Sequence, residues 1–106
     1  MTQIHFIEKL KRQQLMDPHT HTYASGNWRV EPAAAEALVG ARIYFHETAA
    51  GPSYFGGEIT GFREVETPDA EAGRVVFIFK ADQKGRGVLA GRTGWRLEHK
   101  TITDPA

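Results

Sequence analysis

The sequence contains no cysteine. This absence excludes disulfide bonds, thiolate metal sites and cysteine nucleophiles. A small domain without disulfides has to be stabilised by its own hydrophobic core, which is typical of a reducing compartment. We therefore expect a cytoplasmic protein.

Long hydrophobic runs and common catalytic motifs are also missing. No stretch of about 18 apolar residues is present, so we expect no membrane-spanning helix. The N-terminal stretch MTQIHFIEKLKRQQ has charges where a signal peptide needs an apolar centre. The sequence has no Walker loop, dinucleotide fingerprint or G-x-S-x-G elbow. We therefore expect a binding protein without a cofactor rather than an enzyme.

The net charge is zero, with 13 basic and 13 acidic residues, but the two signs are unevenly distributed. Residues 31–73 carry a net charge of −6, whereas residues 74–100 carry +5. A basic segment in a neutral protein can form a surface that attracts anions. The alternative is that the acidic and basic segments pair with each other in the folded chain.

The length of 106 residues suits one domain, so we take residues 1–106 as a single unit. Residues 1–18 form an N-terminal amphipathic segment and residues 20–102 a β-rich core. The apolar residues of 4–16 fall on one half of a helical wheel, which predicts a helix that ends at Asp17-Pro18. A short strand over residues 4–7 is the alternative.

The remaining pattern is mostly typical of β structure. Residues 20–24 predict a strand, residues 25–27 a turn, and Pro32 and Gly40 bracket a short helix. Residues 41–48 alternate cleanly, residues 51–57 read as a loop, and residues 58–66 predict a strand with a bulge at Gly61. Residues 75–79 predict a central strand, residues 81–94 a glycine-rich basic loop, and residues 95–102 a last strand.

These elements predict an α+β domain, a small barrel-like fold of five or more strands with one or two short helices. The alternation and the apolar run place a common set of side chains in the core: Ile43, Phe45, Val75, Phe77, Phe79 and Leu97.

His19 and His21 form an H-x-H pair, which on a strand would place two metal ligands on one face. A third ligand would have to come from His5, His46, His99 or a carboxylate, and no spacing selects one. The sequence therefore predicts no metal site. A small hydrolase or metal enzyme that uses His19, His21 and His46 is one hypothesis for the function, which we rank third, after the two given at the end of this subsection.

Aromatic residues interleaved with arginine and glycine give the stronger signal. Trp28, Tyr54 and Trp95 each lie near glycine or serine, where an exposed ring could stack on a base. The alternative is that both tryptophans fill the core, whereas Tyr54 is expected at a loop tip or pocket rim. Cations of the basic loop could hold phosphates, and these are Lys84, Arg86, Arg92 and Arg96.

The order of several short motifs resembles the PUA-like superfamily, with the EVE and ASCH types most similar. The motifs are SGNWRV (25–30), GARIYFH (40–46), SYFGGEITGF (53–62) and GRVVFIFK (73–80), and the resemblance covers residues 20–102. It implies a small pseudo-barrel that binds RNA or modified bases in DNA. Trp28, Tyr54 and Trp95 would then be walls of a base pocket, with Arg42 and Ser53 near its mouth.

Two main hypotheses for the function follow. The first is a nucleic-acid-binding module that reads RNA or a modified base through an aromatic pocket and the basic loop. The second is a protein interaction or scaffold domain that docks its partner through the N-terminal helix or an edge strand.

Overall fold

The computed structural model of the protein describes residues 2–65, 74–95 and 99–103. Within these residues the chain is mostly β, with one short α-helix and one 3-10 turn. The elements are β1 (Thr2–Ile7), β2 (Gln14–Asp17), β3 (Thr22–Arg29), α1 (Pro32–Ala37), β4 (Arg42–His46), β5 (Ser53–Glu64), β6 (Arg74–Ala81), η1 (Gln83–Gly85) and β7 (His99–Thr103).

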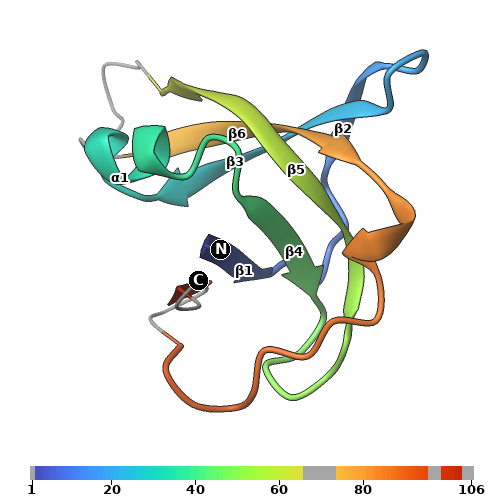
Figure 1. Ribbon diagram of the computed structural model, residues 1–106, viewed down its shortest axis with the longest axis vertical. Helices are drawn as coiled ribbons and strands as arrows, with labels where there is room; N and C mark the ends of the chain where they lie inside the picture. The colour runs from blue at the N-terminus through green and yellow to red at the C-terminus, as the bar shows by residue number, and fades with distance from the viewer. Residues whose placement is uncertain (1, 66–73, 96–98, 104–106) are drawn as a thin grey trace.

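The seven described strands form one sheet in the order β2-β3-β6-β5-β4-β1-β7 (Figure 1). β1 pairs in parallel with β4, and the other neighbours are antiparallel. The apolar run that predicts a central strand lies in β6, between β3 and β5, so that prediction is confirmed.

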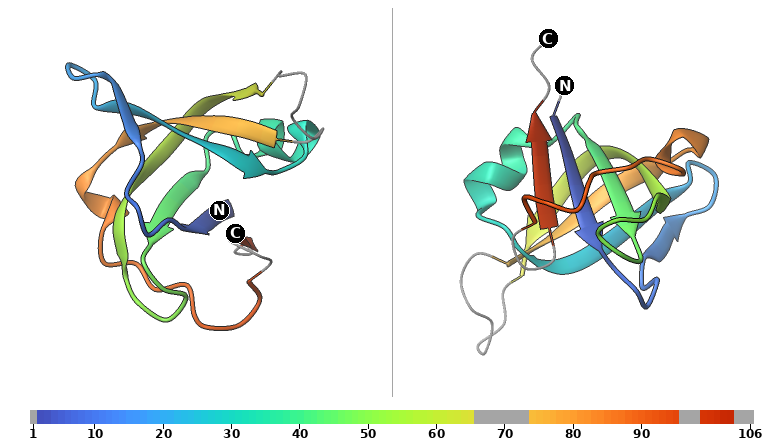
Figure 2. Two further views of the ribbon diagram at one scale, coloured as in Figure 1. Left: turned by 180° about the vertical axis from the view of Figure 1, so that it is seen from behind. Right: turned by 90° about the horizontal axis from the view of Figure 1, so that it is seen from below.

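The sheet curls strongly around its inner face (Figure 2). Phe6 of β1 stacks on Trp28 of β3 with 4.1 Å between ring centroids, although three strands separate β1 from β3 in the sheet order. Phe77 of β6 lies 5.9 Å from the same Phe6 ring. Across residues 2–65, 74–95 and 99–103, no pairing joins the edge strands β2 and β7. The β-rich prediction is confirmed, and the sheet is curled but not closed.

The inner face of the curl holds the core. Five of the six predicted core residues are buried, namely Ile43, Phe45, Val75, Phe77 and Phe79, and Leu97 lies outside the described residues. The helix α1 adds Ala35 to this core, and Leu38, just past its last residue, is also buried. No helix in the described part of the chain has the length and apolarity to cross a membrane.

The predicted N-terminal helix is wrong, and the alternative strand is confirmed in β1. Ile4 and Phe6 face the core, whereas His5 between them lies on the outer face, and all three are buried. β1 is hydrogen-bonded to β4 on one side and to β7 on the other. Side chains of β1 alternate between the two faces of the sheet, and neighbouring strands on both sides pair with its backbone. This tertiary pairing outweighs the helical spacing of apolar residues in the longer segment 4–16.

Three other predicted boundaries also need correction. The predicted turn at residues 25–27 is a register shift inside β3. Residues 54 and 55 lie in β5 rather than in a loop, because this end of β5 pairs with β4, with Phe55 opposite Phe45. Gly57, just beyond, allows β5 to approach β6 closely, since a Cβ there would lie 1.9 Å from the Lys80 carbonyl oxygen. Within the described residues the last strand covers His99–Thr103, and Trp95, where the prediction starts it, is not in a strand. The predicted bulge at Gly61 is confirmed by a register shift between Ile59 and Gly61.

The curled core gives a direct test of the fold. Replacing the fully buried Phe77 with alanine should lower the free energy of unfolding by about 3–5 kcal/mol, because a large cavity is left behind. Urea denaturation measures this loss. Met16→Ala, at a side chain that is 56% exposed, is the control and should change stability by about 0.5 kcal/mol or less. A loss below about 1 kcal/mol for Phe77→Ala would contradict the assignment of β6 to the core.

Candidate ligand-binding groove

Two adjoining cavities form one groove at the open end of the curled sheet. The first, of about 410 Å³, is lined by His21, Tyr23, Phe55, Ala81, Asp82, Gln83 and Arg86. The second, of about 380 Å³, shares Tyr23, Phe55 and Arg86 and adds Lys11, Gln13 and Tyr54. We call the two together the mouth groove. Cavities of this size that aromatic and a few polar side chains line are common ligand sites.

Aromatic rings form the floor of the mouth groove. Tyr23 of β3 and Phe55 of β5 meet edge to face, with 4.9 Å between centroids and an interplanar angle of 83°. Both rest on Phe79, at 5.9 and 5.7 Å, and Phe79 is fully buried. Tyr23 and Phe55 are themselves half-buried. The floor is therefore an extension of the core that a planar ligand can reach.

One rim of the groove is the turn that carries Arg86. Asp82 at its start accepts two hydrogen bonds from the Arg42 guanidinium, at 2.6 and 2.7 Å. These bonds lower the pKa of Asp82. The buried Ser53 hydroxyl donates to the Gly85 carbonyl at 2.8 Å and accepts from the Val88 N–H at 3.0 Å. Arg42 and Ser53, predicted at a pocket mouth, therefore hold the turn that presents Arg86.

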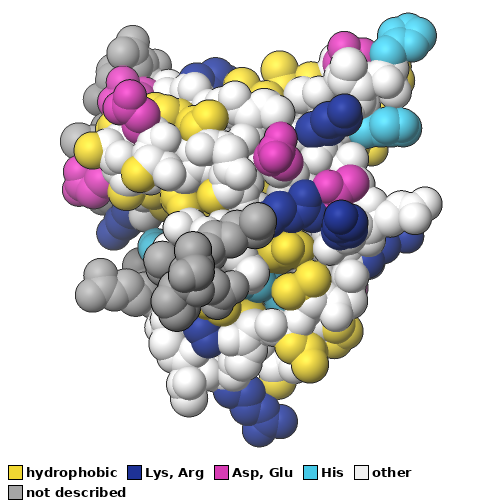
Figure 3. Space-filling model, in the orientation of Figure 1, with side chains coloured by type: hydrophobic (Ala, Val, Ile, Leu, Met, Phe, Trp, Pro, Cys, Tyr) yellow, Lys and Arg dark blue, Asp and Glu magenta, His cyan; other side chains and the backbone are white. Residues whose placement is uncertain are grey.

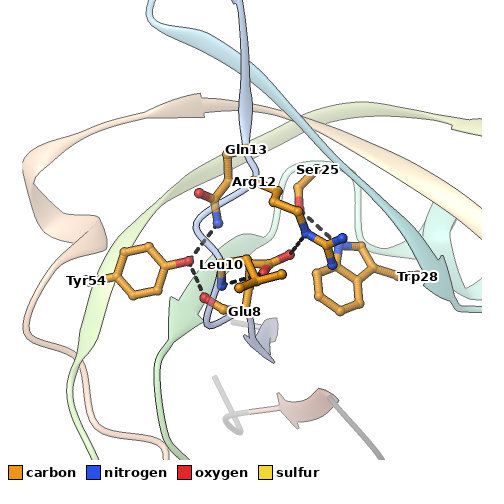
Figure 4. A network of polar contacts seen from close by, with 7 residues as sticks. All are labelled: Glu8, Leu10, Arg12, Gln13, Ser25, Trp28 and Tyr54. Carbon is orange, nitrogen blue, oxygen red and sulfur yellow. Dashed lines mark hydrogen bonds and ion pairs between the residues drawn. The ribbon is translucent and has the colours of Figure 1, made fainter.

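The opposite rim is a strap formed by residues 8–11, the first part of the connection between β1 and β2 (Figure 4). The Tyr54 hydroxyl donates to the Glu8 carbonyl at 2.6 Å and accepts from the Gln13 side-chain amide at 2.9 Å. Burial raises the pKa of Tyr54, so the hydroxyl stays a neutral donor. The Lys11 ammonium lies 5.1 Å from the centre of the Tyr54 ring and 3.0 Å from Glu47. The strap thereby brings a second cation to the groove.

Backbone strain is concentrated at the groove. In the described ranges, the residues other than glycine with positive φ are Lys11, at 52°, and His21, at 55°. Both line the mouth groove. A left-handed conformation costs an ordinary residue about 1–2 kcal/mol, and such strain clusters at ligand sites. The strain therefore independently singles out the same groove.

The structure brings only Tyr54 and Arg86 of the predicted site residues into the groove lining. Trp28 is 7% exposed and lies in the core, where its indole N–H donates to Ser25 at 3.0 Å. Lys84 and Arg92 are exposed and do not line the groove, and Arg96 lies outside the described residues. Sequence reasoning missed Tyr23, Phe55 and Lys11, whose roles depend on the curl of the sheet.

Trp95 belongs to a separate cluster on the outer face, around the buried pair His5 and His46. Its ring centre lies 5.7 Å from that of His46. His46 Nδ1 donates to the Gly51 carbonyl at 2.9 Å, so its Nε2 accepts from His5 Nδ1 at 2.8 Å. Burial is the main cause that lowers the pKa of both, to about 4 for His5. Lys100, opposite His5 in β7, adds to the shift of His5.

Neither the pair His5 and His46 nor the predicted group of His19, His21 and His46 forms a metal centre in the described ranges. His19 and His21 are both exposed, and His46, the third member of the predicted set, is fully buried next to His5. Among the residues that the structure describes, no three histidine, aspartate or glutamate side chains are grouped to hold a metal ion.

Comparison of the chain with protein families, curated proteins and solved structures gives no match. The resemblance to PUA-like domains therefore stays a prediction.

The buried histidine pair predicts acid sensitivity. A histidine with pKa 6.5 when unfolded and about 4 when folded binds its proton only in the unfolded state between these values. The stability that depends on neutral His5 is therefore complete above pH 6.5 and falls as the pH drops, by about 3 kcal/mol near pH 4. Urea denaturation between pH 7.5 and 4.5 measures this fall.

His5→Asn keeps a donor near Nδ1 but does not titrate, so its stability should fall less steeply with acid. His19→Gln, at an exposed site, is the control and should behave as the native chain does. An unchanged acid dependence in His5→Asn would contradict the prediction.

The strain at the groove is tested by two substitutions of one residue. Lys11→Gly and Lys11→Ala remove the same charge and the same contacts, but only alanine keeps the steric cost of a φ of 52°. We expect the glycine variant to be more stable than the alanine variant by about 1 kcal/mol. Thermal unfolding of the two variants measures the difference, and equal or reversed stabilities would show that position 11 is not strained.

Proposed function

We propose that the protein binds single-stranded nucleic acid, with one unpaired base in the mouth groove and backbone phosphates at Arg86 and Lys11. One observation carries the proposal: aromatic rings from two strands and cations from two separate segments line the same open groove. Unpaired bases are bound in this way, by stacking on aromatic side chains beside cations that contact the backbone.

The local charges favour an anionic ligand at the groove. Asp82 is the acidic residue of the described groove lining, and Arg42 neutralises it through two short hydrogen bonds. Arg86 is exposed at the rim. A phosphate at the rim therefore meets the exposed guanidinium of Arg86 and a carboxylate that is already paired.

The electrostatic contribution to binding should be small. The cations of the described groove lining are few, and Lys11 among them is paired with Glu47 at 3.0 Å. Figure 3 shows Lys and Arg side chains on this face next to Asp and Glu side chains. If two phosphates are bound, a plot of the logarithm of the binding constant against the logarithm of the salt concentration should have a slope of about −1 to −2.

We also propose that the curled sheet is a half-closed barrel of the PUA-like kind. The support is the order of elements, in which α1 follows β3 and precedes β4, and the contact of β1 with β3 across the inside of the curl. The cytoplasmic location stays a proposal based on the absence of cysteine.

Titration of a fluorescent single-stranded oligonucleotide of mixed sequence, at several salt concentrations, tests the proposed function. Arg86→Ala should weaken binding and make the salt slope shallower by about 0.7, because one phosphate contact is lost. Arg92→Ala removes an arginine that is also exposed but lies outside the groove lining, and it is the matched control. Equal salt slopes for the two variants would rule out Arg86 as a phosphate ligand. No binding at about 100 μM protein would end the proposal as a whole.

Stacking is tested separately from charge. Tyr23→Leu keeps an apolar side chain in the floor of the groove but removes one aromatic face, so the affinity should fall about tenfold, within the range measured for one base. The salt slope should not change, because stacking releases no counterions. A changed slope with unchanged affinity at low salt would show that Tyr23 acts through the fold rather than through the base. Thermal unfolding checks that the variant is folded.

A further inference from the structure

The edge strand β2 carries exposed apolar side chains beside the mouth groove. Leu15 is 52% exposed and Met16 56% exposed. β2 is the last strand of the sheet at this edge and pairs with β3 alone. Figures 1 and 2 show the β2–β3 hairpin extending from the body of the molecule. About half of each of these two side chains is open to solvent, although burying it would be favourable.

The strand register places Leu15 on the face of the groove. Leu15 lies directly opposite Tyr23, and directly opposed residues of paired strands project from the same face of a sheet. Tyr23 forms part of the groove floor, whereas Leu15 lies just beyond the lining. Met16 falls where the register shifts between Leu15 and Asp17, and it has no partner in the pairing of β2 with β3. Leu15 and Met16 are therefore similarly exposed, but only the register of Leu15 places it on the face of the sheet that carries the groove floor.

The segment that carries β2 has a residue with strained backbone at each of its two ends. Residues 12–20 lie between Lys11 and His21, the two residues with left-handed backbone. Most side chains of residues 12–20 are exposed, and the pairing of β2 with β3 is short and irregular. The contacts of Gln13 with Tyr54 and of Arg12 with Glu8 hold the segment at its Lys11 end. Segments with few buried contacts open and move at low cost, and a few residues at their ends absorb the change in backbone angles.

We propose that residues 12–20 form a flap that tilts about Lys11 and His21 when a base enters the mouth groove, so that Leu15 covers the base. The inference rests on the proposed function and adds to it a residue that contacts the ligand. The base is then held between the aromatic floor, Tyr23 and Phe55, and an aliphatic side chain from the flap. The exposed half of Leu15 loses water only when the ligand is bound, so the burial of this half contributes to affinity rather than to the stability of the free protein.

The test compares Leu15→Ser with Met16→Ser, which remove apolar side chains from neighbouring positions of β2. Each variant is titrated with the same fluorescent single-stranded oligonucleotide as the native chain, at one low salt concentration. Leu15→Ser should bind about fivefold more weakly, as expected when about half of a leucine side chain is no longer buried. Met16→Ser should bind within about twofold of the native chain. Thermal unfolding should be nearly unchanged in both, because both positions are exposed.

Amide hydrogen exchange gives the second measurement. Addition of the oligonucleotide should slow exchange in residues 12–20 of the native chain and of Met16→Ser, and less so in Leu15→Ser. If the native chain binds but the two variants bind equally well, or if exchange in residues 12–20 does not change, the flap is wrong and the proposed function remains. If the native chain does not bind the oligonucleotide, both fail together.

Discussion

The stacking of Phe6 on Trp28 is the contact on which the rest of the structure depends. It joins β1 to β3 across the inside of the sheet, where no backbone hydrogen bond connects them. The contact keeps the sheet curled, because a flat sheet would hold these two rings three strands apart. The curl forms a single enclosed core and leaves one end open, and the aromatic floor of the groove is the part of that core that reaches the open end. The core and the candidate site therefore have one physical origin.

The chain after β6 contributes to both faces of the sheet. It first forms one rim of the groove and then packs Trp95 against the outer face. The turn that follows β6 is fixed by Ser53 and Asp82, and it presents Arg86 to the groove. The chain beyond it brings Trp95 to the buried His5 and His46. Burial keeps these histidines neutral, so they serve as a hydrogen-bonded part of the structure and are not available to a ligand. The outer cluster is joined to the strap as well, because the Glu8 N–H donates to the His46 carbonyl oxygen at 2.9 Å.

Local patterns in the sequence predict the parts of the fold that local chemistry decides. The apolar run of β6, the alternation of β4, the bulge at Gly61 and the helix after Pro32 each follow from neighbouring residues. The N-terminal strand is not predictable in this way, because its place between β4 and β7 depends on partners far along the chain. The groove is harder still. Tyr23 and Phe55 are unremarkable in the sequence, and they meet only because β3 and β5 both flank β6 in a curled sheet. Of the predicted site, Tyr54 and Arg86 reach the groove lining, whereas Trp28 is buried in the core as the alternative allowed.

The neutral net charge and the strained groove point to the same mode of binding. A strongly basic protein attracts any polyanion over long distances, and its affinity then depends mainly on salt. In this chain, carboxylates pair with Arg42 and Lys11, so long-range attraction is weak and most of the affinity has to come from contacts made inside the groove. Such contacts require a surface of fixed shape, which the tied turn and the strap provide. Lys11 and His21 hold strained backbone at the two ends of residues 12–20, a mostly exposed segment beside the groove. A groove with a rigid floor and rims and one loosely held edge can admit a flat ligand and then cover it, and the strained residues lie where that edge has to bend.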